Sequence, residues 1–216
     1  MILLADQALK FYIKTHYHAG QETLLFGNWG RLHFLENPGM AWGWKLGNGG
    51  DWGKIALTVF RMVAVVFGVF YIGKIVKRKD HVGFIFCVAL IFAGAVGNLI
   101  DSMFYGIFFQ ESNEYTLNVA RFLPHGGGYT TFLHGKVVDM LYFPIIQTHY
   151  PNWVPWVGGQ EFEFFSPVFN IADASISCGL IIILLFQKKF FGQQGKSEKY
   201  PTVETSSPVN DEMQIS

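Results

Sequence analysis

Three long and almost uninterrupted apolar stretches dominate the chain, at residues 55–76, 82–101 and 167–186. A helix needs about 20 mostly apolar residues to cross the hydrocarbon core of a bilayer. Each stretch meets that length, so the pattern predicts three transmembrane helices. For the last of them, Ser166 and Pro167 are typical of an N-cap and a first helical residue.

The N-terminal stretch "MILLADQALKFYIKTHY" also has helical character, but only five residues precede Asp6. Five helical residues span about 7 Å, far less than the roughly 30 Å of a bilayer core. We expect either that the functional protein has further apolar residues before Met1 or that this helix enters the bilayer only partway. Asp6 and Lys10 stand in the order that favours a helical ion pair, so a structural role is the default for both.

Basic residues in the short connections indicate the orientation of these helices. Cytoplasmic loops carry an excess of Lys and Arg, so segments 15–54 and 102–166, which hold few of them, are expected outside. Both are rich in Gly, Trp, Phe and Tyr, which suits domains at the bilayer interface. Within the first, "GNWGRLHFLENPGMAWGW" alternates and is broken by glycine, which predicts short strands. The cytoplasmic basic residues are Lys77, Arg78 and Lys79 in the loop, and Lys188, Lys189, Lys196 and Lys199 after the last stretch.

The composition agrees with a membrane protein. Half of the 216 residues are apolar and only 15% are charged, against about a quarter in soluble domains. The net charge of zero gives no reason to expect a nucleic-acid partner. We expect one membrane-embedded domain over residues 1–187 and a polar, disordered cytoplasmic tail over 188–216. Cys87 and Cys178 lie in apolar runs and are expected to be small core residues rather than a disulfide.

Metal-binding and nucleophile motifs are missing from the sequence. It contains no HExxH, GxSxG or P-loop, and its seven histidines are scattered, so we expect neither a metal nor a cofactor. What remains are carboxylates and asparagines within or beside the apolar stretches, where ionisable residues are rare and usually functional. Two close carboxylates that share a proton can activate water, which is the chemistry of aspartic peptidases.

The last apolar stretch contains a polar stripe. Asn170, Asp173 and Ser177 are spaced i, i+3 and i+7, which places them on one helical face. With Pro167 as the first helical residue, Asp173 lies about 9 Å into the helix, just below the outer surface. A polar residue that only packs against a neighbouring helix is the alternative.

The second stretch ends in "GNLID", where Asn98 and Asp101 are again three positions apart. Ala89, Ala93 and Gly97 form a small-residue ridge that favours close helix packing. A carboxylate at a helix C-terminus opposes the helix dipole, so Asp101 is expected to have a specific hydrogen-bonding role. A structural cap or loop anchor is the alternative.

Two further charged residues stand in apolar surroundings. Asp139, in "GKVVDMLYFP", is expected in a half-buried segment outside the membrane, where an ordinary hydrogen-bonded aspartate is the default interpretation. Arg61 lies near the outer end of the first apolar stretch, and snorkelling to the interface would explain it.

Five blocks of this sequence, taken in order, resemble those of lipoprotein signal peptidase, the type II signal peptidase of bacteria. They are "DQALK", "ENPGMAWG", "GNLID", "VVDM" and "FNIADASI", and they extend from Asp6 to Ile176. The resemblance implies a mainly helical integral membrane protein with four transmembrane helices, a small strand-rich extracytoplasmic cradle and both termini in the cytoplasm. It also implies an aspartic endopeptidase of the bacterial inner membrane, with its active site near the extracytoplasmic face.

The resemblance also implies substrates, inhibitors and site residues. The substrates would be lipidated prolipoproteins in contact with membrane lipid, cleaved just before the diacylglyceryl-modified cysteine, and the inhibitors would be cyclic peptides of the globomycin type. No cofactor or metal is implied. By matching motifs, the catalytic residues are Asp139 and Asp173, the residues that line the site are Asn37, Asn98 and Asn170, and the structural polar residues are Asp6, Lys10 and Asp101.

The sequence departs from the family pattern in two places. The family usually has arginine after "GNLID", where this chain has Ser102, and Arg61 is a candidate replacement for the missing positive charge. The connection from Asp101 to Asp139 is longer than usual and carries "RFLPHGGGYTTF".

Two other classes of protein place polar residues in membrane helices. A transporter or proton-coupled channel usually shows more helices and paired repeats, and this chain has no repeat. A non-enzymatic scaffold that binds lipoproteins or lipid would keep its function without Asp173.

Overall fold

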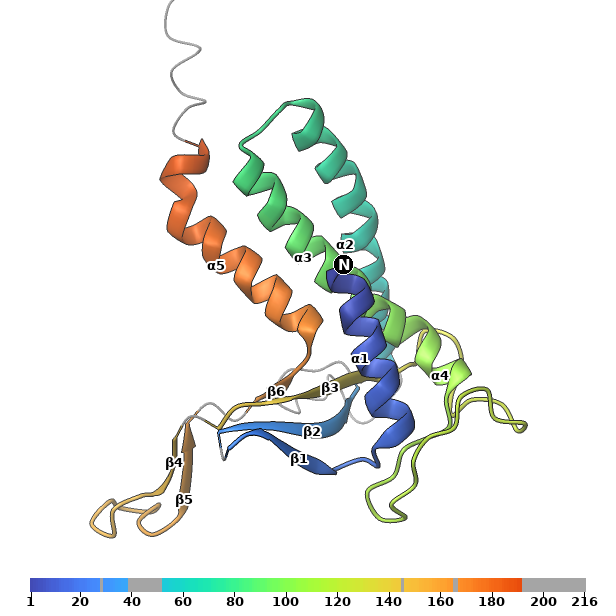
Figure 1. Cartoon of the computed structure of the whole chain (residues 1–216), viewed down its shortest axis with the longest axis vertical. Helices are drawn as coiled ribbons and strands as arrows, with labels where there is room; N and C mark the ends of the chain where they lie inside the picture. The colour runs from blue at the N-terminus through green and yellow to red at the C-terminus, as the bar shows by residue number, and fades with distance from the viewer. Residues whose placement is uncertain (28, 39–51, 145, 165–166, 192–216) are drawn as a thin grey trace, which may run out of the picture.

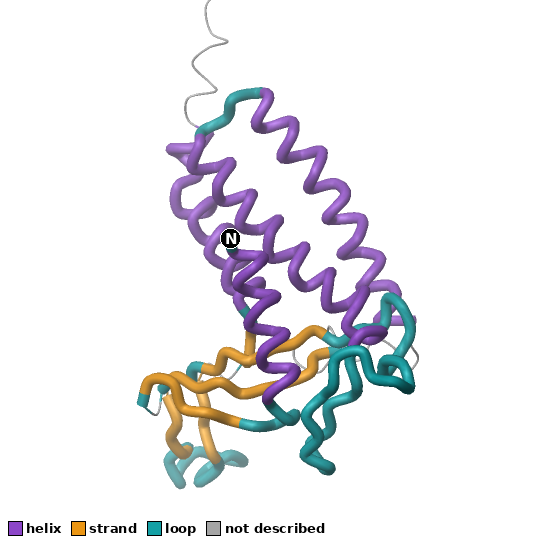
Figure 2. Tube along the Cα trace, turned by 45° about the vertical axis from the view of Figure 1, so that its right-hand side comes forward, coloured by secondary structure: helices purple, strands orange, loops and turns teal. Residues whose placement is uncertain are grey.

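Helices and a small antiparallel sheet make up the molecule. The computed structural model describes the whole chain except residues 28, 39–51, 145, 165–166 and 192–216. The long helices stand together on one side of the sheet (Figure 1), and the strands gather at one end of them (Figure 2). These helices are α1 (Ile2–His16), α2 (Trp52–Lys77), α3 (Val82–Ile100) and α5 (Ile171–Phe191).

Three helical segments of the described chain are long and apolar enough to cross a membrane. They are Trp52–Lys77, Val82–Phe108 and Ile171–Phe191, with mean hydropathies of 2.3, 2.3 and 1.7. Side chains such as Phe67 and Phe70 of α2 are exposed, as expected for a helix surface that faces lipid rather than water. The three predicted apolar stretches therefore each form a helix that could span a membrane, although each helix differs from its predicted stretch at one end or both.

The N-terminal helix α1 is shorter than the other three. Its 15 residues extend about 22 Å at 1.5 Å per residue, less than a bilayer core. It packs against α3 and α5, and its buried side is polar as well as apolar, with Asp6, Lys10, Ile13 and Lys14 facing inward. A helix with this inward face requires partners on its neighbours that neutralise its charges.

The prediction that α3 ends at Asp101 is wrong. The helix continues without a break through a five-residue π-helix, Asp101–Tyr105, and the short helix α4, Gly106–Phe108. Asp101 therefore lies inside a continuous helix, and the argument from the helix dipole does not apply to it. Short π-helical segments within α-helices occur frequently at functional sites.

The predicted start of the last helix at Pro167 is also wrong. Val168 and Phe169 form strand β6, which pairs with Tyr142 and Leu141 of β3, and helix α5 begins only at Ile171. Val168 and Phe169, which the local Ser-Pro signal predicts to be helical, are therefore paired in the sheet instead. Ser166 lies outside the described residues.

Asn170 is the N-cap of α5. Its Oδ1 accepts a hydrogen bond from the backbone N–H of Asp173 at 2.9 Å, and Asp173 Oδ2 accepts one from the backbone N–H of Asn170 at 3.4 Å. This reciprocal pair is a capping box. The spacing of Asn170 and Asp173 thus reflects a helix start rather than a polar stripe, and Ser177 is exposed while Ser175 is buried.

The four-stranded sheet has the order β1-β2-β3-β6, with each neighbouring pair antiparallel. Short strands in the first outer segment are confirmed, and residues 39–51 of that segment lie outside the described part of the chain. A separate hairpin, β4 and β5, projects from the sheet (Figure 1). The strands are β1 (Glu22–Phe26), β2 (Gly30–Asn37), β3 (Val137–Tyr142), β4 (Ile146–His149), β5 (Glu161–Phe164) and β6 (Val168–Phe169).

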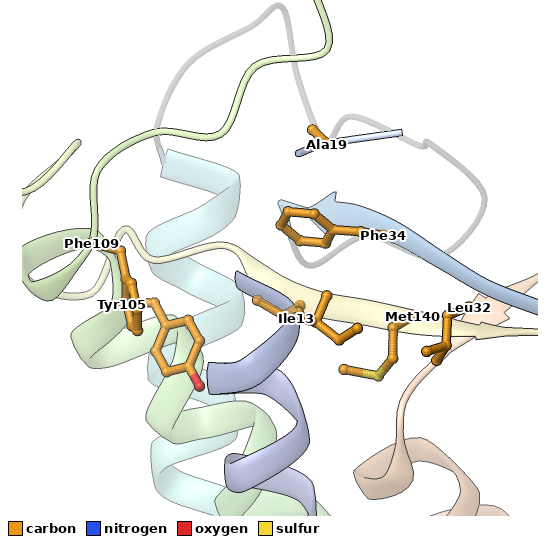
Figure 3. Packing of buried hydrophobic residues seen from close by; sticks show 8 residues of the cluster. Ile13, Ala19, Leu32, Phe34, Tyr105, Phe109 and Met140 are labelled. Atoms are coloured by element: carbon orange, nitrogen blue, oxygen red, sulfur yellow. The ribbon is translucent and has the colours of Figure 1, made fainter. Parts of the chain in front are cut away.

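An apolar core joins the sheet to α1 and to the extension of α3. Figure 3 shows Ile13 of α1 between residues of the sheet and aromatic rings of the α3 extension. Burial of these side chains holds β3 against the helices, because each Å² of apolar surface removed from water contributes about 25 cal/mol of stabilising free energy. The cluster consists of Ile13, Ala19, Leu32, Phe34, Tyr105, Phe109, Val138 and Met140.

Glycines allow α3 to approach its neighbours closely. A Cβ added to Gly94 would lie 2.3 Å from the carbonyl oxygen of Ala172, and one added to Gly97 would lie 2.7 Å from Asp6 Oδ2. The predicted ridge of small residues is therefore correct at Gly97, whereas Ala89 is exposed. Any larger residue at these two positions would separate the helices that carry the polar residues.

The cysteines and the end of the described chain add two details. Cys87 is buried, as predicted, but Cys178 is exposed, contrary to the expectation of a core residue. Helix α5 continues to Phe191 and includes Lys188 and Lys189, so the first residues of the predicted tail are helical, and residues 192–216 lie outside the described part.

Candidate active site

Asp139 lies in the middle of the sheet, on strand β3, and only 3% of it is exposed. The side-chain nitrogen of Asn37 donates a hydrogen bond to its Oδ2 at 3.0 Å, and that of Asn170 donates one to its Oδ1 at 2.7 Å. The sequence predicted a half-buried segment, whereas the carboxyl is almost fully buried. Each oxygen has a donor, and these hydrogen bonds offset part of the cost of burying the charged form.

Asp173 lies in the first turn of α5 and is partly exposed. Its Oδ1 accepts a hydrogen bond from the side-chain nitrogen of Asn98 at 2.7 Å, and its Oδ2 accepts the one from the backbone of Asn170. The carboxyl is therefore oriented by α3 as well as by its own helix. Its partial exposure leaves it accessible to water.

Asn170 contacts both aspartates and is completely buried. Its side chain bonds Asp139 at 2.7 Å, while its backbone N–H and its Oδ1 form the capping box with Asp173. A single residue at the junction of β6 and α5 thus sets the position of one carboxyl relative to the other.

Asn98 continues the same hydrogen-bond network on α3. Its Oδ1 accepts from Asn170 at 3.1 Å and from Lys10 Nζ at 2.9 Å, and its nitrogen donates to Asp173. Two donors meet its oxygen and a carboxylate meets its nitrogen, so only one orientation of the amide satisfies all partners.

Asp6, Lys10 and Asp101 form a buried ion-pair group next to this network. Lys10 Nζ lies 2.9 Å from Asp6 Oδ2 and 2.8 Å from Asp101 Oδ2, and all three residues are at most 1% exposed. Asp6 also accepts from the backbone N–H of Ala172 at 2.9 Å, and Asp101 accepts from that of Val138 at 3.3 Å. The group therefore ties α1 to α3, α5 and β3.

Sequence reasoning missed Gln7, although it lies inside "DQALK". Its side-chain nitrogen donates to Asp101 Oδ1 at 2.9 Å and to the carbonyl oxygen of Gly97 at 3.2 Å. No sequence signal marks an ordinary glutamine of this kind, because its partners lie about ninety positions away.

A second buried ion pair, Lys14 with Glu36, was also missed. Lys14 Nζ lies 3.0 Å from Ser112 Oγ and 5.0 Å from the ring centroid of Tyr129. Ser112 and Tyr129 belong to the long connection between Asp101 and Asp139. That connection thus covers the ion pair and holds the end of β2, which carries Asn37.

Arg61 of α2 faces the same region of the protein. Its Nη1 donates to Ser102 Oγ at 2.8 Å, and Ser102 Oγ in turn donates to the carbonyl oxygen of Asn98 at 2.9 Å. The guanidinium interacts electrostatically with Asp173 most strongly, followed by Asp101 and Asp139. Arg61 thus contacts Ser102, the position where the family pattern has an arginine. Snorkelling to the bilayer interface alone therefore does not describe its contacts.

The electrostatics of Asp139 suit proton transfer near neutral pH. Burial raises the pKa of its carboxyl from 3.8 to about 7, and the charge of Asp173 acts in the same direction. The hydrogen bonds from Asn37 and Asn170, and the charge of Lys10, oppose this rise. A carboxyl with such a pKa exchanges its proton readily at physiological pH.

The described residues contain no group of three or more His, Cys, Asp or Glu side chains that could hold a metal ion. The helices, the sheet and the two linked carboxyls define a membrane-embedded protein whose polar site has the composition of an aspartic peptidase. The predicted site residues Asn37, Asn98, Asp139, Asn170 and Asp173 all meet at this site.

Comparisons with known proteins agree with this class. A family model described as "Signal peptidase (SPase) II" matches residues 1–189. A lipoprotein signal peptidase of Porphyromonas gingivalis is 45% identical over 186 residues, which cover 86% of this chain and 78% of that protein. One from Amoebophilus asiaticus is 32% identical over 209 residues, covering 95% and 81%.

The chain belongs to the lipoprotein signal peptidase family, the signal peptidase II group of aspartic peptidases. Its activity is the removal of signal peptides from prolipoproteins. The transporter and scaffold alternatives are therefore set aside.

A solved structure supports the fold. It is described as a bacterial membrane enzyme determined by the in meso method at 1.9 Å resolution, and it is 22% identical to this chain. The match has a TM-score of 0.54 and covers 87% of this chain and 88% of the other. At this identity the match supports only the similarity in the arrangement of helices and sheet.

Proposed function

We propose that Asp139 and Asp173 are the catalytic aspartates of this peptidase. The observation that carries the proposal is the position of Asn170, which bonds Asp139 with its side chain and Asp173 with its cap. A buried, fully hydrogen-bonded residue between two carboxyls fixes their separation, and preorganisation of this kind favours catalysis.

The reaction is the addition of water to the scissile carbonyl. One carboxylate takes a proton from the water as its oxygen bonds to the carbonyl carbon, and the other carboxyl gives its proton to the carbonyl oxygen. The carbon–nitrogen bond then breaks: the departing amine takes up a proton from the pair, and one hydroxyl of the tetrahedral intermediate gives its proton back to the pair. In this mechanism one carboxyl carries a proton while the other is ionised.

The surrounding polar residues have supporting roles in this proposal. Asn37, Asn98 and Asn170 line the site and orient the carboxylates through the hydrogen bonds described above. Asp6, Lys10 and Asp101 hold α1 against the rest of the protein, so their role is structural.

The site lies at the extracytoplasmic face of the bacterial inner membrane in this proposal. Figure 1 shows the basic loop between α2 and α3 at the end of the helices that is farthest from the sheet, which agrees with a cytoplasmic loop and an outer sheet. The helix α1 completes a bundle of four membrane helices, with residues 1–187 as one domain and 188–216 as a cytoplasmic tail.

The substrate in this proposal is a lipidated prolipoprotein, cleaved before its diacylglyceryl-modified cysteine. Asp173 is partly exposed at the start of a membrane helix, where a substrate that is anchored by acyl chains would present its backbone. Globomycin-type cyclic peptides are expected to compete at the same place.

The test uses the purified full chain and a prolipoprotein with and without its diacylglyceryl group. Mass spectrometry should show one cut, directly before the modified cysteine, in the lipidated substrate only. Asp173→Asn should leave that substrate intact. Equal cleavage of both substrates, or a cut at another bond, would contradict the proposed specificity.

A further inference from the structure

We infer that Arg61 is a positioning residue of the peptidase: it supplies the positive charge that keeps the Asp139 and Asp173 pair in its working protonation state, and Ser102 holds its guanidinium in place. The inference rests on the proposal that these two aspartates are catalytic. It assigns a function to a charged residue of a membrane helix and to a serine of the π-helical segment.

The contacts of Arg61 point inward rather than toward water. Its side chain leaves α2 and donates to Ser102 Oγ at 2.8 Å, and Ser102 is only 2% exposed. The same hydroxyl donates to the backbone of Asn98, whose side chain bonds Asp173. The guanidinium is therefore linked, through the Ser102 hydroxyl, to Asn98, the residue that orients Asp173.

The charges that face the aspartate pair come from three other elements. Helix α1 contributes Asp6 and Lys10, the π-helix contributes Asp101, and α2 contributes Arg61. Lys10 is paired with both Asp6 and Asp101, although its charge also acts on Asp139.

Arg61 is different in this respect. Among the described residues, no carboxylate oxygen lies within 4.0 Å of its guanidinium, so no single ion pair offsets its charge. Its electrostatic interactions are instead spread over Asp173, Asp101 and Asp139. The carboxylates in this region outnumber the cations. Loss of Arg61 would therefore make the surroundings of the aspartate pair more negative and would favour a second proton on the pair.

The direction of the effect on activity follows from this charge balance. An opposite charge within about 4–6 Å favours the ionised form of a carboxyl, typically by one to three pKa units. At a larger separation we expect about one unit. A reaction that needs one acid and one base has a bell-shaped pH profile, and without Arg61 both limbs of that profile should move upward by about one pH unit.

The experiment measures initial rates of cleavage of a lipidated prolipoprotein by the purified full chain between pH 4 and 10. Arg61→Gln removes the charge and should shift both limbs upward by about one unit. Arg61→Lys keeps the charge and should stay within a few tenths of a unit of the wild type. Ser102→Ala removes only the hydroxyl and should shift the limbs in the same direction, by less than Arg61→Gln.

Thr58→Val is the matched control on the same helix. Thr58 lies one turn before Arg61 and donates to the carbonyl oxygen of Leu133 at 3.1 Å, so this variant also loses a contact between α2 and the outer segment. It carries no charge, and its pH profile should match that of the wild type. Thermal unfolding of every variant is measured alongside.

The outcomes separate this inference from the proposed function. A uniform loss of rate at every pH in Arg61→Gln, or an equal shift in Thr58→Val, would show a structural role and overturn the inference. An Arg61→Lys profile displaced as far as that of Arg61→Gln would overturn it as well. Continued cleavage by Asp139→Asn or Asp173→Asn would instead refute the proposed catalytic pair.

Discussion

Replacing Asn170 with serine or with alanine removes different sets of its hydrogen bonds. Serine is as good an N-cap as asparagine, whereas alanine is not. Neither side chain is long enough to replace the 2.7 Å bond from Asn170 to Asp139. The two variants therefore separate the capping of α5 from the link between the carboxyls.

The size of each effect follows from these bonds. Loss of an N-cap costs about 1 kcal/mol, which lowers the unfolding midpoint of a chain of this size by about 2–4 °C. Asn170→Ala loses the cap and should show this decrease, whereas Asn170→Ser keeps a cap and should not. Loss of a hydrogen bond to a charged partner costs about 1.5 kcal/mol or more, equivalent to roughly one pKa unit. The pKa of Asp139, about 7 in the intact protein, should rise in both variants.

The expected activities follow from the same reasoning. With a pKa near 7, about half of the Asp139 carboxyls are ionised at pH 7, and after a rise of one unit about a tenth are. Displacement of the carboxyl adds to this, since a misplacement of about 1 Å can lower the rate by roughly a hundredfold. Both variants should therefore lose activity by similar factors.

The assay combines initial rates of prolipoprotein cleavage at several pH values with thermal unfolding in detergent. We expect Asn170→Ser and Asn170→Ala to be similarly slow and to reach their best rate at higher pH than the wild type, with only Asn170→Ala further destabilised. A wild-type rate and pH profile for Asn170→Ser would refute the idea that this residue aligns the pair.

Three further predictions concern stability and topology. Lys10→Met should lower the yield and the unfolding midpoint strongly, because it leaves Asp6 and Asp101 buried without their cation, a change that costs about 3–5 kcal/mol; an unchanged midpoint would contradict this. The pKa of Asp139 is raised in the folded state, so its contribution to stability is full below about pH 4 and is lost as the pH rises through 7; Asp139→Asn should flatten the decline of the unfolding midpoint over that range, and an identical pH dependence would count against it. Reporter tags in the loop at 77–80 and after Gln187 should report the cytoplasm and one near His125 the outside, whereas the same side for all three would exclude the membrane arrangement proposed above.

The membrane helices could be predicted from the sequence because their signal is local. In α2 the run of apolar residues and the helix itself nearly coincide. The expected boundary at Ile55–Val76 differs from Trp52–Lys77 by a few residues, which is the usual uncertainty of helix ends.

The boundaries that were wrong depend on distant partners. Asp101 ended the apolar run, but the helix continues because Lys10 of α1 and Gln7 neutralise and bond that carboxylate. The start of α5 moved by four residues because Val168 and Phe169 pair with β3, which no local signal indicates.

The site residues were located by motif resemblance, whereas their connections were not. The capping box of Asn170 and Asp173 was present in the sequence as an i, i+3 pair, a spacing that a helical stripe shares. The contacts of Arg61 with Ser102 and of Lys14 with Glu36 join segments that are 41 and 22 positions apart. Contacts of this kind appear only once the chain has folded.

The central claim, that Asp139 and Asp173 act as one catalytic unit, is tested most directly by the initial rates of cleavage of a lipidated prolipoprotein. Asparagine keeps the shape of aspartate and one acceptor oxygen but cannot take up or release a proton as a carboxyl does. We predict that Asp139→Asn and Asp173→Asn each reduce cleavage to background while the protein still inserts into the membrane, and that the double variant is no worse than either single one, because members of one catalytic unit are not additive. Substantial cleavage by either single variant would contradict the account.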